Sequence, residues 1–459
     1  MIDPVWQGGA SINQTRALCE FLSGMTLEQI GEENLLDIRY KTLDWLGCAI
    51  AAVDRPCARE TLAMNRAAGG NPQASGVGQT ERTSAQNAAF YNGLISHALE
   101  YDDTNKIAIT HPGAPVIAAA LAVAEAREAS FADYALGVTA GYEAMIRMGG
   151  AVNPDHYTHW HTTGTCGTFA AAAAAVKIMG LDGAAMERAM GIASTMASGL
   201  IYVFGTDAKL VTVGNAARNG IVAAELAERG LTAPEDAFAG PKGYARSAGG
   251  KEDLSFLVPK PGDRLMLEDA YYKMHASCGH THSALDALQA LMAEHSFTPE
   301  DVESVEAEVY RTAWELCGEY KTDLETKAKF SLPFCLAVTL LHGQCTLSEF
   351  APDLLHSGAV EEYAKRIQVR ENADYTKSYP QLRTERVTLC LKDGRRLEKS
   401  VDLPVGKPPY SFIDQKYTSL AGMTVTGDCA DKIREIVLSL KNETPIRAVG
   451  DAVRTLRRK

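Results

Sequence analysis

Segments rich in alanine and glycine, repeated with the period of an α-helix, constrain the fold of this chain most strongly. Residues 170–175 are six consecutive alanines. Alanine favours the helix, and small side chains allow two helices to approach closely. Segments of this kind, or with leucine and isoleucine at helical spacing, occur at 34–53, 118–126, 134–148, 167–179, 184–197 and 216–228. We therefore predict a densely packed, all-helical domain over residues 1–267.

Strand-like alternation begins after residue 268. Val305, Ala307 and Val309 alternate with more polar residues, and the same period returns at 387–391. Asp393-Gly394 is typical of a hairpin turn that leads into a further strand at 397–401. A helical stretch at 332–341 lies between these strands. The pattern predicts a smaller α+β domain over residues 268–409.

The end of the chain returns to the helical period. Prolines at 404, 408 and 409 predict a linker. The apolar face of the helix that follows consists of Ile433, Ile436, Val437 and Leu440. We expect 410–459 to pack back onto the first domain. The predicted fold class is therefore mainly α, with a large all-helical domain built from both chain ends and a smaller α+β domain.

The bulk composition excludes several classes of protein. A chain of 459 residues exceeds one compact core, which favours two domains. Its net charge of −12 argues against nucleic acid as a partner, because a surface that binds nucleic acid has to be basic. An acidic protein that binds acidic small molecules must instead concentrate its cations locally.

Cysteine usage and the absence of targeting patterns predict a cytoplasmic protein. None of the ten cysteines forms a Cys-x-x-Cys pair, and several lie in apolar runs, as free thiols do in a reducing compartment. The polar N-terminal segment has no signal-peptide pattern. Charge or glycine interrupts the long apolar stretches, so no membrane span is expected.

Cationic or protonatable residues stand near the predicted starts of three helices. His111 precedes a helix expected near Val116, His161 opens the alanine-rich helix, and Lys209 precedes a helix expected near Gly214. Helix N-termini expose free N–H groups and the positive end of a dipole, so they attract carboxylates. The threonine hydroxyls at 162, 163 and 165 would add donors. If these three helix starts converge, they form a site for an anion.

A histidine-rich segment at 273–282 starts the second predicted domain and precedes a helix that contains Asp286. Together with His159 and His161, it raises the alternative of a zinc site. Side chains two positions apart do not share a helix face. No carboxylate stands at a spacing that completes a zinc motif. We therefore predict no metal ion.

Two further motif classes are absent. The glycine-rich stretch at 69–78 lacks the Gly-Lys-Ser/Thr end of a phosphate loop and the Gly-x-Gly-x-x-Gly pattern, so it predicts a turn region. No Gly-x-Ser-x-Gly elbow occurs, which argues against a standard α/β-hydrolase.

Taken in order, several blocks of this sequence resemble the MmgE/PrpD family. They are SHALEYDDT at 96–104, HPG at 111–113, WHTTGTCG at 160–167, Lys209 followed by GNAA at 214–217, the segment 273–286, and AKFSL at 328–332. The resemblance implies a helical domain formed by both chain ends, an α+β lid domain, a homodimer, and a site in the cleft between domains that needs no cofactor. Members of the family include 2-methylcitrate dehydratase, cis-aconitate decarboxylase and iminodisuccinate epimerase.

Carried over position by position, the resemblance implies two groups of site residues. The catalytic candidates are His111, His161, Lys209, Lys273 and Glu100. The candidates for substrate contact are Thr104, Asp102, Thr163, Cys278 and His275. Glu100 stands where decarboxylase-like members have Asp, and Cys278 where cis-aconitate decarboxylase has a catalytic His. Tyr320 is the candidate for the tyrosine of the family's lid.

These residues predict a lyase that transfers a proton next to a carboxylate of a small di- or tricarboxylic acid, such as 2-methylcitrate. Lys209 and Lys273 would bind substrate carboxylates and stabilise the developing enediolate. His161 or His111 would carry the proton, and the other histidine or Glu100 would protonate a leaving hydroxyl. Dehydration is the first expectation, epimerisation the second and decarboxylation the third. A carboxylate-binding protein without activity and a zinc hydrolase are the remaining alternatives.

Overall fold

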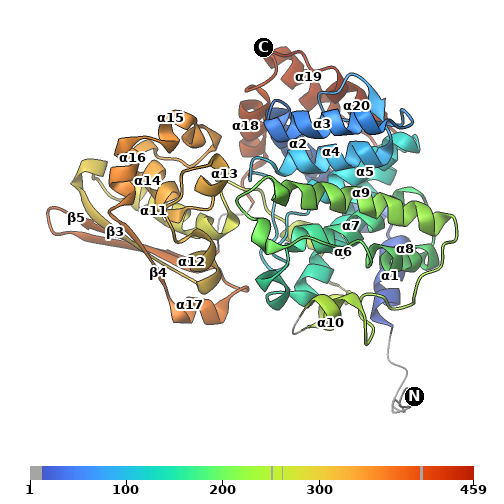
Figure 1. Cartoon of the computed structure of the whole chain (residues 1–459), viewed down its shortest axis with the longest axis horizontal. Coiled ribbons are helices and arrows are strands. Elements are labelled where there is room, and N and C mark those ends of the chain that lie inside the picture. Colours follow the sequence, from blue (N-terminus) through green and yellow to red (C-terminus); the bar gives the residue numbers. More distant parts are fainter. Residues whose placement is uncertain (1–12, 250–251, 261, 404–406) are drawn as a thin grey trace.

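Helices dominate the computed structural model, which describes residues 13–459 apart from 250–251, 261 and 404–406 (Figure 1). The helices of the first part are α1 (Gln14–Gly24), α2 (Leu27–Ala52), α3 (Pro56–Ala68), α4 (Ala85–His97), α5 (Gly113–Ala126), α6 (Phe131–Val152), α7 (Thr162–Ile178), α8 (Gly183–Ala193), α9 (Ala208–Glu228) and α10 (Tyr244–Ala248). A two-stranded hairpin joins β1 (Ala74–Ser75) to β2 (Arg82–Thr83). The predicted mainly α class is confirmed.

The alanine-rich helix α7 lies at the centre of this part and packs against α5, α6, α8 and α9. All six alanines at 170–175 are fully buried. Close approach explains the small residues, because a Cβ placed on Gly220 of α9 would lie 2.4 Å from the Cβ of Ala171. Larger side chains at this contact would force the helices apart.

The second part contains a four-stranded sheet and short helices, which lie on the left in Figure 1. Its elements are α11 (His282–Glu294), β3 (Val302–Val309), α12 (Arg311–Cys317), α13 (Glu325–Ala328), α14 (Leu332–His342), α15 (Pro352–Leu355), α16 (Gly358–Ala364), β4 (Ile367–Glu371), α17 (Ala373–Ser378), β5 (Glu385–Leu391) and β6 (Arg396–Val401). The strand order is β4-β3-β5-β6.

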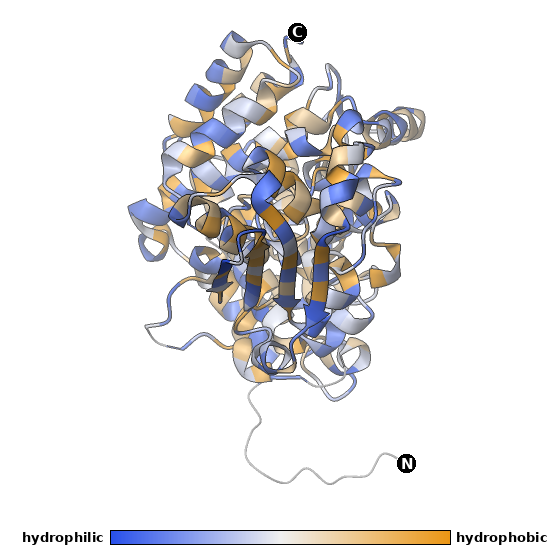
Figure 2. Ribbon diagram, turned by 90° about the vertical axis from the view of Figure 1, so that its left-hand side faces the viewer, coloured by the Kyte–Doolittle hydropathy of each residue, from blue (hydrophilic) through white to orange (hydrophobic). Residues whose placement is uncertain are grey.

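The sheet reproduces the predicted alternation and adds one strand. In β3, Val305, Ala307 and Val309 are buried, and Figure 2 shows hydrophobic and hydrophilic bands alternating along the strands. β3 pairs antiparallel with β5, and β5 forms the predicted hairpin with β6. The strand β4 was not predicted. It pairs parallel with β3. Ile367 and Val369 alternate with Gln368 and Arg370, but only Ile367 is buried, so the alternation in this five-residue strand is a weak signal.

The chain end forms α18 (Tyr410–Ala421), α19 (Gly427–Leu438) and α20 (Arg447–Arg454). Helix α18 packs against α2, and Lys416 of α18 forms a buried ion pair with Asp44 of α2 at 2.7 Å. The boundaries at 267/268 and 409/410 and the lid role of the second part remain predictions. Pro404 of the predicted linker lies outside the described residues. Within the described part, no helix combines the length and the apolar character needed to cross a bilayer.

Candidate active site

A small cavity lies where the starts of α5, α7 and α9 meet the segment before α11. The residues that line it are Glu100, Thr104, Ile109, His111, Tyr157, His161, Thr163, Phe204, Lys209, Cys278, Gly279, His280, Phe330 and Arg383. The two histidines and the lysine singled out at predicted helix starts therefore share one cavity. They come from three helices that are far apart in the sequence.

The helix starts differ slightly from the predictions. His111 precedes α5 by two residues, and His161 is the N-cap residue of α7. Helix α9 begins at Ala208 rather than near Gly214, so Lys209 lies inside its first turn and not before it. The predicted start was too late because Gly214, a residue with low helix propensity, is an interior residue of α9. There its missing side chain admits Phe90, whose carbonyl oxygen would lie 2.6 Å from an added Cβ.

Glu100 forms ion pairs with both of the lysines that were expected to bind substrate. Its carboxylate forms a buried ion pair with Lys209, and its Oε2 lies 3.5 Å from Nζ of Lys273. Burial raises the pKa of Glu100, but the charges of Lys209, His97 and Lys273 outweigh burial and hold this pKa well below its ordinary value. Glu100 is therefore ionised at neutral pH, which argues against its predicted role as a proton donor.

The backbone of Glu100 is held in an unusual conformation. Its φ is 52°, in the left-handed region that a residue with a side chain rarely adopts. The carbonyls of residues 99, 100 and 101 accept hydrogen bonds from Nζ of Lys329, Lys273 and Lys416 at 2.8, 2.9 and 2.6 Å. We call Lys329, Lys273 and Lys416 the lysine clamp. Three separate segments of the chain thus fix the peptide units around Glu100.

His161 has a defined tautomer. Its Nδ1 lies 2.8 Å from Oγ1 of Thr212, and the Thr212 hydroxyl donates to the carbonyl of Lys209 at 2.7 Å. Because the Thr212 hydroxyl already donates its proton to this carbonyl, its oxygen must accept the hydrogen bond from Nδ1–H of His161. Nε2 of His161 is then a bare lone pair, and it is buried without a hydrogen-bond partner in the described structure. Burial and the nearby Lys209, His97 and His111 hold the pKa of His161 well below 6.5.

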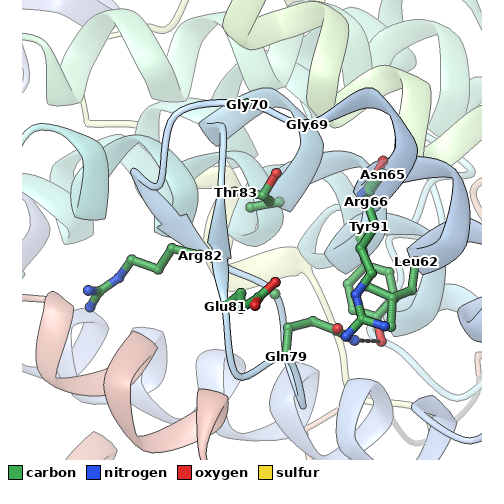
Figure 3. Close-up of a pocket in the computed structure, with 12 residues that line it drawn as sticks. Leu62, Asn65, Arg66, Gly69, Gly70, Gln79, Glu81, Arg82, Thr83 and Tyr91 are labelled. Carbon is green, nitrogen blue, oxygen red and sulfur yellow. Dashed lines mark hydrogen bonds between the residues drawn. The ribbon is translucent and has the colours of Figure 1, made fainter.

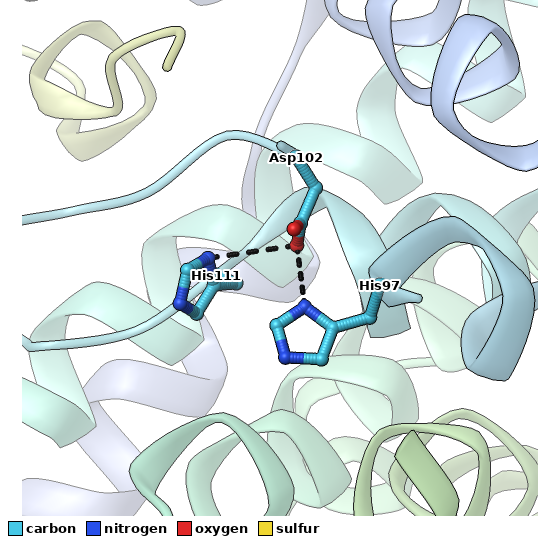
Figure 4. A group of neighbouring side chains, drawn as sticks. All are labelled: His97, Asp102 and His111. Carbon is cyan, nitrogen blue, oxygen red and sulfur yellow. Dashed lines mark hydrogen bonds and ion pairs between the residues drawn. The ribbon is translucent and has the colours of Figure 1, made fainter. Parts of the chain in front are cut away.

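His111 and His97 share the carboxylate of Asp102 (Figure 4). Nδ1 of His97 lies 2.8 Å and Nδ1 of His111 3.5 Å from Oδ2 of Asp102. Nδ1 of His111 also reaches the carbonyl of Asp103 at 3.0 Å, and its backbone N–H donates to Oγ1 of Thr163 at 3.1 Å. Burial, with Lys273 and His97, holds the pKa of His111 well below 6.5 despite Asp102. Asp102 therefore positions histidines from behind the cavity and does not line it.

The same three side chains are the group in the described structure that could in principle hold a metal ion. Their arrangement argues against that use. Nδ1 of both His97 and His111 faces the oxygen of Asp102, as N–H donors to a carboxylate do. The ammonium groups of Lys209 and Lys273 lie on the adjoining Glu100 and would repel a divalent cation.

Arg383 and Tyr157 line the cavity, but no sequence signal selected them. Arg383 precedes β5 by two residues in a segment of ordinary composition, and the residue is 2% exposed. His97 belongs to the matched block at 96–104, yet a single histidine in an apolar helix is usually a core residue. Only the fold brings these side chains to His111 and His161.

Four predicted site residues are not among the residues that line the cavity. Two of them lie directly behind it, Lys273 against Glu100 and Asp102 against His111. The other two are His275 and Tyr320. Nε2 of His275 bonds Oδ1 of Asp286 at 2.9 Å, and its ring packs edge-on against His282, so His275 is not among the lining residues. Tyr320, the candidate lid tyrosine, is 38% exposed and does not line the cavity either. Thr104 and Cys278 do line it, as predicted from the resemblance.

A second cavity lies between α3, α4 and the β1–β2 hairpin (Figure 3). It includes part of the glycine-rich stretch at 69–78. Two of its polar groups bond one another, since Nε2 of Gln79 donates to the hydroxyl of Tyr91 at 3.0 Å. Its lining residues include Glu81 and Arg82 but no histidine, lysine or cysteine. This cavity therefore lacks the histidine and lysine set of the first.

Comparison with known families agrees with the arrangement of the chain. Residues 16–257 match the MmgE/PrpD N-terminal domain, and residues 275–442 match the MmgE/PrpD C-terminal domain. The chain belongs to the MmgE/PrpD family. The resemblance found in the separate sequence blocks is thus confirmed over most of the chain.

Several relatives of this MmgE/PrpD protein carry the same name. It is 27% identical to cis-aconitate decarboxylase of Aspergillus terreus over an alignment that covers 94% of each chain. It is 27% identical to the cis-aconitate decarboxylase of Mus musculus, over 77% of this chain and 75% of the relative. The cis-aconitate decarboxylase of Homo sapiens is 26% identical, over 77% of this chain and 76% of the relative.

Proposed function

We propose that this MmgE/PrpD protein is a lyase that moves a proton beside a carboxylate of a small di- or tricarboxylic acid, and that it catalyses dehydration. The observation that carries the proposal is the bare, buried Nε2 of His161 at the wall of a small cavity that it shares with Lys209 and Arg383. A lone pair kept free of hydrogen bonds, on an imidazole held neutral, is suited to act as a base.

The first step removes a proton from carbon. Nε2 of His161 takes the proton next to a substrate carboxylate, and the C–H electron pair moves into that carboxylate to form an enediolate. Positive charge around the cavity, from Lys209, Lys273 and Arg383, stabilises the added negative charge. Throughout the reaction, Thr212 accepts a hydrogen bond from Nδ1–H of His161, which keeps the ring in place.

The second step expels water. The enediolate electrons form the carbon–carbon double bond as the bond from the neighbouring carbon to its hydroxyl breaks. The imidazolium of His161 returns its proton to the departing hydroxide, so the proton balance closes within one residue. Hydrogen bonds to Asp103 and contact with Asp102 orient His111, which is the second candidate for this proton transfer.

The protonation state of the site favours dehydration over decarboxylation. In dehydration the enzyme starts with a neutral base, and the proton that this base takes from carbon leaves in the product water. In decarboxylation the carbon–carbon bond breaks first, and the carbanion that remains must receive a proton from an acid. His111 and His161 are both held neutral, with pKa values well below 6.5, so neither starts as that acid, and the ammonium groups of Lys209 and Lys273 are held by Glu100.

Decarboxylation of cis-aconitate is the second candidate, because the relatives described above are named for that activity. One position differs, since the resemblance implies a catalytic histidine where this chain has Cys278. Cys278 lies on the cavity wall. In the sequence it stands between Lys273 and His280. A homodimer and a cytoplasmic location are part of the same proposal.

The test is a panel of 2-methylcitrate, citrate, cis-aconitate and iminodisuccinate with the purified protein. Products are followed by proton NMR, and released carbon dioxide is measured separately. Loss of water from 2-methylcitrate or citrate without carbon dioxide supports dehydration. Release of carbon dioxide from cis-aconitate selects the second candidate, and exchange or inversion of iminodisuccinate alone selects an epimerase. No change in any acid, with or without a chelator, overturns the proposal of a lyase.

A further inference from the structure

Arg383 carries a buried positive charge beside the reacting groups. It lines the cavity together with Cys278, Gly279 and His280, and 2% of the residue is exposed. Its backbone N–H donates to the carbonyl of Asp402 at 2.8 Å, which anchors it at the start of β5. The guanidinium therefore comes to the site from the sheet-containing part of the chain.

Burial is the strongest influence on the pKa of Arg383 and acts to lower it. The side chains that oppose burial most strongly are those of four tyrosines, Tyr310, Tyr271, Tyr379 and Tyr157. Burial raises the pKa of these phenols, and it raises the pKa of Tyr379 to about 12, so they are uncharged at neutral pH. An arginine held among neutral tyrosines keeps its full charge.

The hydrogen bonds of the guanidinium are incomplete. Nη2 donates to the carbonyl of Lys106 at 2.8 Å, and Nε has no partner in the described structure. The nearest acidic residue in the sequence, Glu385, does not supply a charged partner. Its Oε2 accepts from the backbone N–H of Ala284 at 2.7 Å, and burial raises its pKa well above the ordinary value, which disfavours its ionised form. Asp286 bonds His275. A buried, partly unsatisfied cation is costly unless an anion joins it.

The other cations of the site are already paired. Glu100 takes both Lys209 and Lys273. We propose, on the basis of the proposed function, that Arg383 binds one carboxylate of the substrate, while the proton beside another carboxylate is transferred at His161. The planar guanidinium fits a carboxylate with two parallel hydrogen bonds, which a lysine cannot make.

This assignment narrows the substrate class. A molecule held by Arg383 at one carboxylate and activated at a second must carry at least two. Di- and tricarboxylates are then ligands, and monocarboxylates of similar size bind poorly. The bond from Arg383 to Lys106 also ties the sheet-containing part to the segment that leads to His111. Substrate bound to Arg383 therefore contacts both parts of the chain.

Calorimetric binding of tricarballylate tests the assignment, because this tricarboxylate has no hydroxyl to lose. Wild type, Arg383→Gln and His161→Gln are compared. Arg366→Gln is the matched control, since Arg366 lies in the same part of the chain and also donates to a backbone carbonyl, that of Val302 at 3.1 Å. We expect Arg383→Gln to lose affinity by about 30-fold or more, as for a buried charge pair that loses one partner. His161→Gln and Arg366→Gln should bind as wild type does.

Thermal unfolding with and without tricarballylate gives an independent readout. Ligand that binds the folded state raises Tm, so wild type is stabilised and Arg383→Gln is not. Arg383→Lys keeps the charge without the fork and should bind with intermediate affinity, which covers the case in which Arg383→Gln does not fold. Wild-type affinity in both Arg383 variants overturns this inference alone. Absence of tricarballylate binding to wild type overturns the proposed function as well.

Discussion

Lys209 and Glu100 form an ion pair in which the side chains are 4% and 6% exposed, at the wall of the cavity. Glu100 also lies against Lys273, so one carboxylate compensates two ammonium groups. We therefore propose that these lysines do not bind substrate directly. In this proposal they hold Glu100, supply positive potential around the enediolate, and leave direct carboxylate binding to Arg383.

Replacing Glu100 by Gln should destabilise the fold, because it leaves two buried ammonium groups without a counter-charge. Breaking a buried pair in this way costs about 3–5 kcal/mol. The free energy of unfolding from urea denaturation measures it. Glu228→Gln is the control, since Glu228 pairs with Arg127 at the surface and its loss should cost about 1 kcal/mol or less. Equal, small effects of the two substitutions would contradict the paired role of Glu100.

Removing one member of the lysine clamp should impair catalysis more than folding. Lys416 binds the carbonyls of Tyr101 and Lys273 and pairs with Asp44, so we combine Lys416→Met with Asp44→Asn to avoid an unpaired charge. Displacement of Glu100 should lower kcat on the order of 10- to 100-fold with a smaller change in KM.

Lys177→Met is the control for the lysine clamp. Lys177 also donates to two backbone carbonyls, those of Ser23 and Met25, and it does not line the cavity. The control should keep wild-type kcat. Lys416→Arg, which preserves charge and donors, should recover part of the lost rate. Equal kcat values for the double variant and the control would refute a positioning role.

Thr212 should control the tautomer of His161. Thr212→Val removes the acceptor of the Nδ1 proton, which frees the ring to turn or to carry its proton on Nε2. We expect kcat to fall on the order of 100-fold. Thr212→Ser keeps the hydroxyl and should retain most of the rate. Thr168→Val serves as control, because the Thr168 hydroxyl bonds only within α7, to the carbonyl of Gly164 at 2.9 Å. Similar rates for the valine and serine variants at 212 would be evidence against this tautomer.

The pH dependence of kcat/KM should lack a histidine limb near neutrality. This parameter reports the free enzyme, in which the pKa of His161 lies well below 6.5 because of burial and the nearby Lys209. A base is active when neutral, so activity should persist as pH falls through 6.5 and be lost only at more acidic pH. Lys209→Met removes a charge that lowers this pKa and should move the limb to higher pH. A wild-type limb centred at 6.5 would exclude His161 as the base.

Glu385 should make folding less favourable as pH rises. Burial raises its pKa well above 4.5, so the folded state keeps a proton that the unfolded carboxyl loses above about 4.3. Stability from this group is full below that pH and declines as pH rises, by about 1.4 kcal/mol per unit until the folded pKa is reached. Glu385→Gln should therefore match wild type near pH 4.5 and be more stable at pH 8. Glu303→Gln, at an exposed position of β3, should show no such trend.

Local chemistry made much of the fold predictable. Alanine and glycine at helical spacing locate α5 to α9, because close helix packing requires small residues along whole faces. Alternation locates β3, β5 and β6. Strand β4 was not predicted, because a parallel edge strand is only partly buried and is not joined to its partner by a hairpin. Lys209 was placed outside its helix because Gly214, taken as a boundary, is a packing contact inside α9.

The site was predictable where function lies in helix starts and not where it depends on tertiary pairing. His111 and His161 stand at helix N-termini, which a sequence reveals. The sequence does not reveal Arg383 in this way, because the four tyrosines that act on its charge come together only in the fold. The pairing of Glu100 with two lysines is likewise a property of three distant segments. Residue types therefore indicated an anion site without showing which cation is free to bind.

Deuterium incorporation from heavy water tests the central claim most directly. Wild type and His161→Gln are incubated in D₂O with each acid of the panel, and the hydrogens beside the carboxylates are followed by proton NMR. We predict that wild type introduces deuterium beside a carboxylate of at least one acid. His161→Gln should introduce none while still binding tricarballylate. Undiminished incorporation by His161→Gln would contradict the role of His161 as the base.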